Sequence, residues 1–228
     1  KLWPVGFNIE GYKSILSNKW ILTGYGNSLF YTVVGTFLNV LVTFMASYSL
    51  SRKDMYGHGL ITFFMVFTMW FGGGLIPTFL VVKKLGLVNT RMVLLLLGLV
   101  SVYNCIICRS FISSSIPYEL QEAARIDGCN KLSAMIRIIL PLAAPGIVTA
   151  MTFVFIAGWN EYTLALILIG DSSLKTINLG IRAFFGYTGT EWWYVFAASI
   201  LATLPILGFF RILERHLTGG LTAGGVKG

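Results

Sequence analysis

The chain has 228 residues, of which only 11% are charged, whereas soluble domains usually carry about 25% charged residues. Hydrophobic residues make up 56% and the mean hydropathy is +0.77, which leaves too few polar residues to cover a water-soluble globule. The composition excludes a disordered chain, a cytosolic enzyme and a secreted disulfide scaffold. The net charge of +8 is dispersed without a basic run, which favours anionic lipid over nucleic acid as a partner.

Five apolar stretches approach the ~20 residues that a transmembrane helix needs. Each contains Gly, Ser, Thr, Asn or Pro, which are typical of close helix contacts in lipid, and no segment alternates like a membrane β-strand. We therefore predict an all-α polytopic helix bundle that forms a single domain over residues 1–228. The predicted spans are 26–50, 60–82, 90–112, 143–169 and 192–213.

The start of the chain and its basic residues say little about orientation. The first residue is Lys1 rather than Met, and the polar residues that follow lack the zones of a signal peptide, so we expect further sequence before it. Lys and Arg divide nine against eight between the two sides of five spans. The positive-inside rule therefore does not orient the bundle.

Two motifs inside the second and third spans are open to more than one interpretation. The run Gly72–Gly74, shortly before Pro77, predicts a break that lines a transport pathway or is only a packing kink. Cys105 and Cys108 form a C-x-x-C pair, a spacing that binds metal or cycles redox state in other proteins. Without a second pair or a nearby histidine, packing is the favoured role here.

The segment 117–141 is predicted to form two short helices with a turn between them. Pro117 suits the first turn of a helix, and Gly128 is a typical left-handed stop. An apolar helical face follows, made of Leu132, Met135, Ile136 and Ile139. From these features alone the segment fits an amphipathic helix pair that lies on the lipid headgroups.

The same segment contains a complete EAA-x3-G-x9-I-x-LP pattern, and it resembles the cytoplasmic coupling loop of ABC importer permeases. The resemblance implies that the segment docks on a cytoplasmic ATPase subunit, which also orients the bundle. The coupling residues would be Glu122, Ala123, Ala124, Asp127, Gly128, Ile138, Leu140 and Pro141.

Other segments extend the resemblance to the carbohydrate-uptake class. Residues 159–162, Trp-Asn-Glu-Tyr, resemble its fourth span, and the last ten residues are similar to those of the smaller permease of the maltose importer. That family has one more helix ahead of the shared core, so we expect a sixth span before residue 1 and an extracellular position for 2–20. The stretch from Gly72 to Thr90 most resembles permeases for complex oligosaccharides and polysaccharides, including acidic ones such as alginate.

Asn160 and Glu161 fall inside the fourth predicted span, where an ionisable side chain costs about 2.5–3.5 kcal/mol at the bilayer centre. Either they line the pathway or they form a hydrogen-bonded clasp between helices. The clasp is favoured, because a feature shared across the family does not encode one particular sugar.

The segment 171–191 is too polar to span and is predicted to be an external loop. It either contacts a binding protein, as the maltose-type resemblance implies, or rests on headgroups through aromatic anchors. The contact candidates are Arg182, Phe184, Phe185 and Tyr187.

The remaining features concern the tail, the histidines and ATP. Residues 214–228 are predicted to be a flexible cytoplasmic tail, and His58 and His216 to be isolated and solvated in polar loops. The sequence has no G-x4-G-K-[ST] phosphate loop and no credible catalytic or metal site, so we expect ATP and Mg on a partner ATPase.

The resemblance implies four kinds of partner in the bacterial inner membrane: a second, larger permease, two ATPase subunits, an extracytoplasmic substrate-binding protein and lipid. Two other classes of function make different demands on the sequence. An ion-coupled secondary carrier would need buried ionisable residues in several spans, and only Glu161 qualifies. A membrane-embedded enzyme would need a nucleophile or a metal set inside the bundle.

Overall fold

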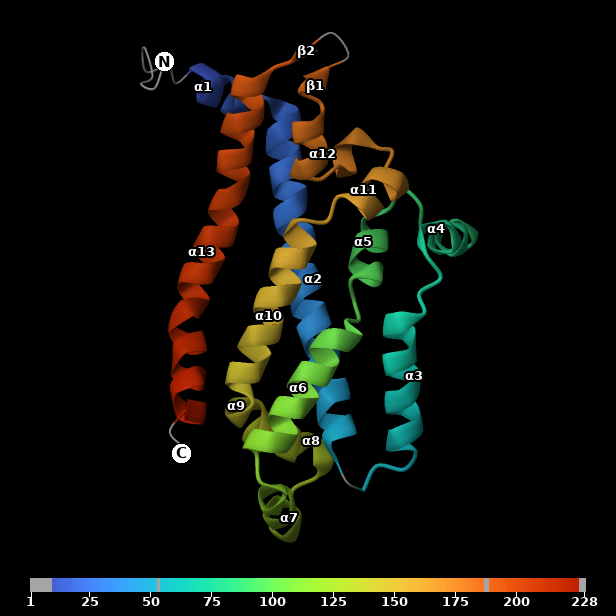
Figure 1. The fold of residues 1–228 in the computed structure, drawn as a ribbon, viewed down its shortest axis with the longest axis vertical. Helices are drawn as coiled ribbons and strands as arrows, with labels where there is room; N and C mark the ends of the chain where they lie inside the picture. Colours follow the sequence, from blue (N-terminus) through green and yellow to red (C-terminus); the bar gives the residue numbers. More distant parts are fainter. Residues whose placement is uncertain (1–9, 53, 187–188, 226–228) are drawn as a thin grey trace.

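The computed structural model describes residues 10–52, 54–186 and 189–225, and of residues 186, 189–190 and 215–225 it describes the backbone alone. The described residues form a bundle of helices along one long axis (Figure 1). A small hairpin, in which β1 (Phe185–Gly186) pairs with β2 (Gly189–Thr190), lies at one end of the bundle. The predicted all-α polytopic class is confirmed.

A 33-residue helix, α2 (Lys19–Ser51), runs through the centre of the bundle. It packs against α6 (Val102–Ser115), α10 (Ala144–Trp159) and α12 (Ile177–Arg182). Asn18 caps its start, because the side-chain Oδ1 accepts from the backbone N–H of Trp20 at 3.0 Å. The short α1 (Glu10–Ser17) precedes it and packs against α13 (Trp192–Gly225).

Three of the membrane segments are bent or broken. Helices α3 (His58–Trp70) and α4 (Leu75–Lys84) meet at 112°, and Gly74 between them has a φ of +81°. The predicted glycine break is therefore present, and α4, seen almost end-on at the edge of the bundle in Figure 1, does not continue along the long axis as α3 does. A second bend, of 45°, separates α5 (Arg91–Leu97) from α6.

In the described part of the chain the candidate spans are compatible with the five predicted, although the fourth is divided differently. Helices α2 and α13 are each long and apolar enough to cross a membrane, and the number rises to as many as five when each bent pair is taken as one span. The predicted span 143–169 is not continuous. Helix α10 ends at Trp159, and a separate α11 (Thr163–Leu168) follows; next come a 3₁₀ turn, η2 (Ser172–Leu174), and α12.

The segment 117–141 forms α7 (Tyr118–Ile126), α8 (Lys131–Ala134), a π-helical turn η1 (Met135–Ile139) and α9 (Leu140–Leu142), and the chain then bends by 80° into α10. The predicted apolar face is only half correct. Met135 and Ile139 are buried, but Leu132 is 59% and Ile136 49% exposed. The wider π turn rotates the helix register, so positions spaced for an α-helix no longer share one face.

The end of the chain differs from the expected flexible tail, because residues 214–225 continue α13 as helix. Where this extension begins, the Arg211 guanidinium and the Glu214 carboxylate form an i,i+3 ion pair at 2.7 Å. Such pairs stabilise a helix by a few tenths of a kcal/mol. The side chain of His216 lies outside the described residues.

Candidate functional site

The buried face of α2 is polar along most of its length. Hydroxyl and amide side chains recur there every three or four residues, which places them on one side of the helix. Sequence reasoning missed this stripe, although its spacing inside an apolar stretch was the available signal. Its members, all 2–7% exposed except the fully buried Ser47, are Asn27, Ser28, Tyr31, Thr32, Thr36, Asn39, Thr43 and Ser47.

The first part of the stripe holds the segment before α12. The Asn27 amide donates to the carbonyls of Ser173 and Lys175 at 2.7 and 3.0 Å, and the Tyr31 hydroxyl donates to the carbonyl of Leu174 at 3.1 Å. The backbone of this segment is therefore anchored to α2.

Two small residues of α2 allow this close approach. Ser28 accepts from the backbone N–H of Ile177 at 2.9 Å. At Gly24 an added Cβ would lie 3.2 Å from the carbonyl oxygen of Thr176, so a larger residue would push the segment away from α2.

The last part of the stripe bonds to the α5–α6 region. The Asn39 amide donates to the carbonyl of Gly98, in the bend after α5, at 2.7 Å, and it accepts from the Thr43 hydroxyl at 3.1 Å. The Ser47 hydroxyl reaches the carbonyl of Cys105 at 2.9 Å. The Asn39 side chain thus pairs a carbonyl in the bend between α5 and α6, where the helix is interrupted, and Ser47 holds α6 itself against α2.

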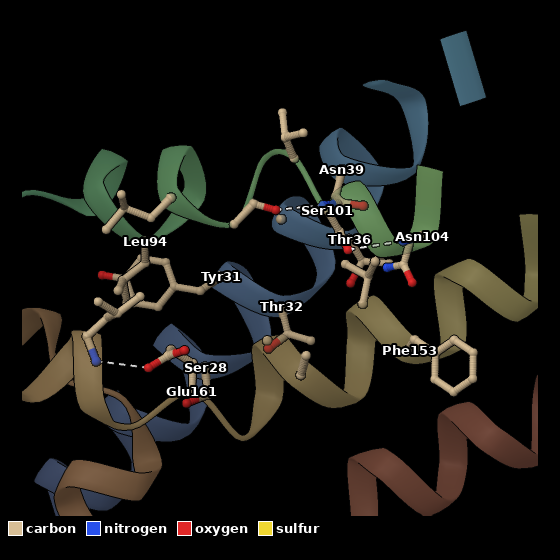
Figure 2. Close-up of a pocket in the computed structure, with 18 of the residues that line it drawn as sticks. Ser28, Tyr31, Thr32, Thr36, Asn39, Leu94, Ser101, Asn104, Phe153 and Glu161 are labelled. Atoms are coloured by element: carbon tan, nitrogen blue, oxygen red, sulfur yellow. Dashed lines mark hydrogen bonds between the residues drawn. The ribbon is translucent and has the colours of Figure 1, made fainter. Parts of the chain in front are cut away.

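Between these two parts lies a cavity of about 410 Å³, bounded by α2, the α5–α6 bend, α10 and Thr176 (Figure 2). The hydroxyls of Thr32, Thr36 and Thr176 and the Oδ1 of Asn104 are buried in its wall without a hydrogen-bond partner. Figure 2 shows Thr32, Thr36, Asn104 and Glu161 among the residues that line this cavity.

The clasp expected at residues 160 and 161 is found instead one residue earlier. The indole N–H of Trp159 donates to the carbonyl of Ala202 in α13, and the Asn178 amide donates to the carbonyl of Trp159, both at 2.9 Å. Asn160 bonds only within α10, to the carbonyl of Ile156. Glu161 accepts from the N–H of Leu164 at 2.9 Å, at the start of α11, and it lines the cavity.

The EAA residues lie at the end of the bundle opposite the hairpin (Figure 1). Gly128 has a φ of +79°, so it adopts the predicted left-handed conformation. Within α7, Glu122 and Ala123 are exposed and Ala124 is buried. Asp127, Leu140 and Pro141 are exposed as well, and Ile138 is half-buried against the core.

The loop after α2 contacts this segment through charged side chains. Asp54 bonds to the Arg52 guanidinium at 2.8 and 2.5 Å and lies 3.8 Å from the Lys131 ammonium at the start of α8. The hydrogen bond from Arg52 holds the pKa of the Asp54 carboxyl below its usual value. The two carboxylate oxygens thereby connect the end of α2 to α8.

His58 is not isolated, which corrects the sequence prediction. Its Nε2 lies 2.6 Å from the Arg109 guanidinium on α6, which also donates to the Thr62 hydroxyl at 3.4 Å. Because arginine is only a donor, the His58 Nε2 acts as the acceptor. These contacts fasten the start of α3 to α6.

The external segment presents some of its predicted contact residues. Arg182 is exposed and Phe185 is 48% exposed, whereas Phe184 packs on Tyr194 with a centroid distance of 5.4 Å. Tyr187 lies outside the described residues.

Neither cysteine pairing nor a metal cluster is found in the described part of the chain. Cys105 and Cys108 are both buried as free thiols, and the Cys105 Sγ lies 3.5 Å from the Ser47 hydroxyl. No group of three or more His, Cys, Asp or Glu side chains that could hold a metal ion occurs among the described residues.

Comparison with known proteins gives one family. The model of the binding-protein-dependent transport system inner membrane component matches residues 21–222. A polygalacturonan/rhamnogalacturonan permease of Bacillus subtilis is 35% identical over all of this chain and 84% of its own length. A trehalose/maltose permease of Thermococcus litoralis is 32% identical over 96% of this chain and 81% of its own.

A solved structure has the same fold. It is that of a bacterial ABC transporter involved in the import of the acidic polysaccharide alginate. The TM-score is 0.86 at 27% identity, with 94% of this chain and 81% of the other covered.

Proposed function

This chain belongs to the family of inner membrane components of binding-protein-dependent transport systems, and from that premise we propose that its cargo is an oligosaccharide or polysaccharide. It is a multi-pass permease subunit of an ABC importer in the bacterial inner membrane, and ATP is hydrolysed by a separate ATPase chain. The cargoes named for its relatives support a saccharide: polygalacturonan or rhamnogalacturonan, trehalose or maltose, and alginate.

Membership of the family implies an ATPase and a substrate-binding protein as partners. A second, different permease would complete the pathway, and two copies of the ATPase, which carry ATP and Mg, would drive it. The exposed aromatic residues of α3, which has no buried residue, support a partner in the membrane: Phe63, Phe64, Phe67 and Trp70 are 44–81% exposed.

The observation that carries the coupling proposal is the shape of the segment 117–141. Glu122 and Ala123 face outward from α7, beside a left-handed turn at Gly128, at the end of the bundle. Ala124 packs inward, and Met135 and Ile139 join the core with Phe44. Movement of an ATPase against the outer face would therefore be passed to helices inside the bundle.

The segment 171–191 would contact the substrate-binding protein through Arg182 and Phe185. Its backbone is tied to α2 by the hydrogen bonds of Asn27 and Tyr31. A segment held in this way fits a rigid contact surface better than a loop that lies on the headgroups. A photo-crosslinker placed at residue 182 or 185 should capture the binding protein. Capture of lipid alone at both sites would contradict the contact.

The proposed function is tested by reconstitution. The chain is expressed with its partner permease, the ATPase and the binding protein, and the complex is placed in liposomes with a panel of saccharides. We expect ATP hydrolysis and saccharide uptake that both require the loaded binding protein. Uptake by the purified chain alone, driven by an ion gradient without ATP, would instead establish a secondary carrier.

A further inference from the structure

The unpartnered polar groups of the described residues are concentrated in one place. Five buried side-chain oxygens lack a hydrogen-bond partner, and four of them, on Thr32, Thr36, Asn104 and Thr176, line the cavity beside α2. These residues are 2%, 6%, 4% and 5% exposed. A buried polar group left unpaired costs about 1–3 kcal/mol, so four in one wall indicate a site that something polar fills.

The neighbouring parts of the same helix show that this is a local property. Asn27, before the cavity on α2, and Asn39, in its lining, donate to backbone carbonyls at 2.7 Å, and Ser47 is bonded as well. Most of the stripe is therefore paired with other segments. The Thr32 and Thr36 hydroxyls line the cavity without a partner, although a Cβ added at Gly158 of α10 would lie only 3.9 Å from Thr32.

The wall of the cavity defines the chemistry of its occupant. Three hydroxyls both donate and accept, and the Asn104 Oδ1 accepts, so the best match carries several groups that do both. Tyr31, Tyr103 and Phe153 add aromatic surface for C–H groups. A volume of about 410 Å³ lies within the usual 300–1,000 Å³ of small-molecule sites. A sugar ring has both the hydroxyls and the apolar faces.

Charge narrows the choice further. The lining residues include Glu161 and no Lys, Arg or His. A carboxylate or sulfate on the occupant would meet a like charge in the wall, with no basic residue in the lining to pair with. An uncharged unit meets no such penalty.

We propose that this cavity binds one uncharged sugar unit of the cargo through its hydroxyl groups, and that Glu161 excludes units that carry an anionic group. The proposal rests on the saccharide cargo proposed above and assigns part of its recognition to this chain.

A labelling experiment on the purified full complex in nanodiscs tests both parts. Thr36→Cys is made in a Cys129→Ser background, since Cys105 and Cys108 are buried. Two methanethiosulfonates are compared, one carrying a glucosyl group and the other a sulfonatoethyl group. A cysteine at the exposed Ser114 gives the reference rate for each reagent.

After this normalisation, the glucosyl reagent should label residue 36 at least tenfold faster than the anionic reagent. Glu161→Gln should reduce the ratio of the two normalised labelling rates, glucosyl over anionic, at least threefold. No labelling at residue 36 by the glucosyl reagent, or equal normalised rates for both reagents, would overturn the proposal.

A protection measurement separates sugar from water. Methyl glucoside at high concentration should slow the labelling of residue 36, and Thr32→Val with Thr176→Val should weaken this protection at least fivefold. These hydroxyls have no protein partner, so their removal leaves the hydrogen bonds of the fold intact. Thr152→Val is the matched control, because Thr152 bonds to the carbonyl of Val148 and does not line the cavity.

Unchanged protection in the double variant would mean that water alone occupies the cavity, and the proposal would be wrong. The labelling needs neither ATP nor transport. A complex that labels as expected but transports no saccharide would therefore contradict the proposed function, whereas a transporting complex without the labelling pattern would contradict this inference alone.

Discussion

Tyr25 and Trp159 donate to consecutive backbone carbonyls of α13, those of Leu201 and Ala202, at 3.4 and 2.9 Å. Pro205 lies inside this helix and has no N–H to offer the carbonyl of Leu201, four residues before it. The two aromatic rings also meet edge to face, with centroids 5.8 Å apart. The Tyr25 hydroxyl thus supplies the donor that Pro205 cannot offer to the Leu201 carbonyl, which is one way that proline is tolerated in membrane helices.

Trp159→Phe should destabilise the bundle, because it removes the donor to the carbonyl of Ala202 and its smaller ring leaves part of the buried space of the indole empty. The lost hydrogen bond costs about 0.5–2 kcal/mol, the scale of hydrogen bonds between membrane helices, and the gap adds to this cost. It is measured as a shift of the unfolding midpoint in mixed detergent. Trp192→Phe, at a site that is 56% exposed, should shift the midpoint much less, and equal shifts would contradict the clasp.

Glu122→Lys should abolish the coupling of ATP hydrolysis to uptake without affecting the fold. The residue is exposed on α7, so reversing its charge disturbs a docked partner and not the core. The measurement compares substrate-stimulated ATP hydrolysis and uptake with assembly of the permease pair. Ser114→Ala, at an exposed position outside the motif, should be nearly silent. Retained transport by Glu122→Lys at normal expression would show that this contact is unimportant.

Gly128→Val should impair coupling through the backbone. The φ of +79° strains any β-branched residue, although an added Cβ would meet nothing within 4 Å. Gly128→Asn makes the matched comparison, because asparagine tolerates the left-handed region. We expect most of the ATP-driven uptake to survive with Asn and to be lost with Val. If both variants keep uptake, or both lose it, the backbone argument fails.

Asp54→Asn should loosen the contact between the end of α2 and α8 by about 0–1 kcal/mol, since the pair is partly exposed. The pKa of Asp54 is lowered in the fold, so its stabilisation is fully present above its ordinary pKa of 3.8 and is lost as pH falls through the lower folded value. Wild type and variant should therefore differ by a constant amount between pH 5 and 8 in hydrogen exchange of residues 131–134. Convergence within that range would contradict the ion pair.

Local backbone geometry was predictable from residue type. Three consecutive glycines predicted the break that the structure places between α3 and α4, and Gly128 predicted a left-handed turn. The break and the turn both depend on backbone conformations that are set locally, by the glycines and the few residues next to them. The angle of the break was not predictable, because the direction of α4 is determined by its packing.

Features that require two distant segments were missed. Asn89 has a φ of +62°, and its Oδ1 accepts from the N–H groups of Gly170 and Asp171, 81 and 82 residues away. The partner of Trp159 lies 43 residues away. Residue spacing indicates which side chains share a helix face, but it does not tell which segment that face meets. The unpaired hydroxyls of the cavity therefore became visible only in the folded chain.

Helix α2 is a rod of about 50 Å, at 1.5 Å of rise per residue, and none of its residues is proline. Asn27, near one end, is bonded to the segment after α11, and Arg52, at the other end, is tied through Asp54 to α8. A displacement of one end of α2 is therefore transmitted along the helix to the segment bonded at its other end. If a partner bound at one end changes the affinity for a ligand at the other end by some factor, thermodynamic linkage requires that this ligand change the affinity for the partner by the same factor.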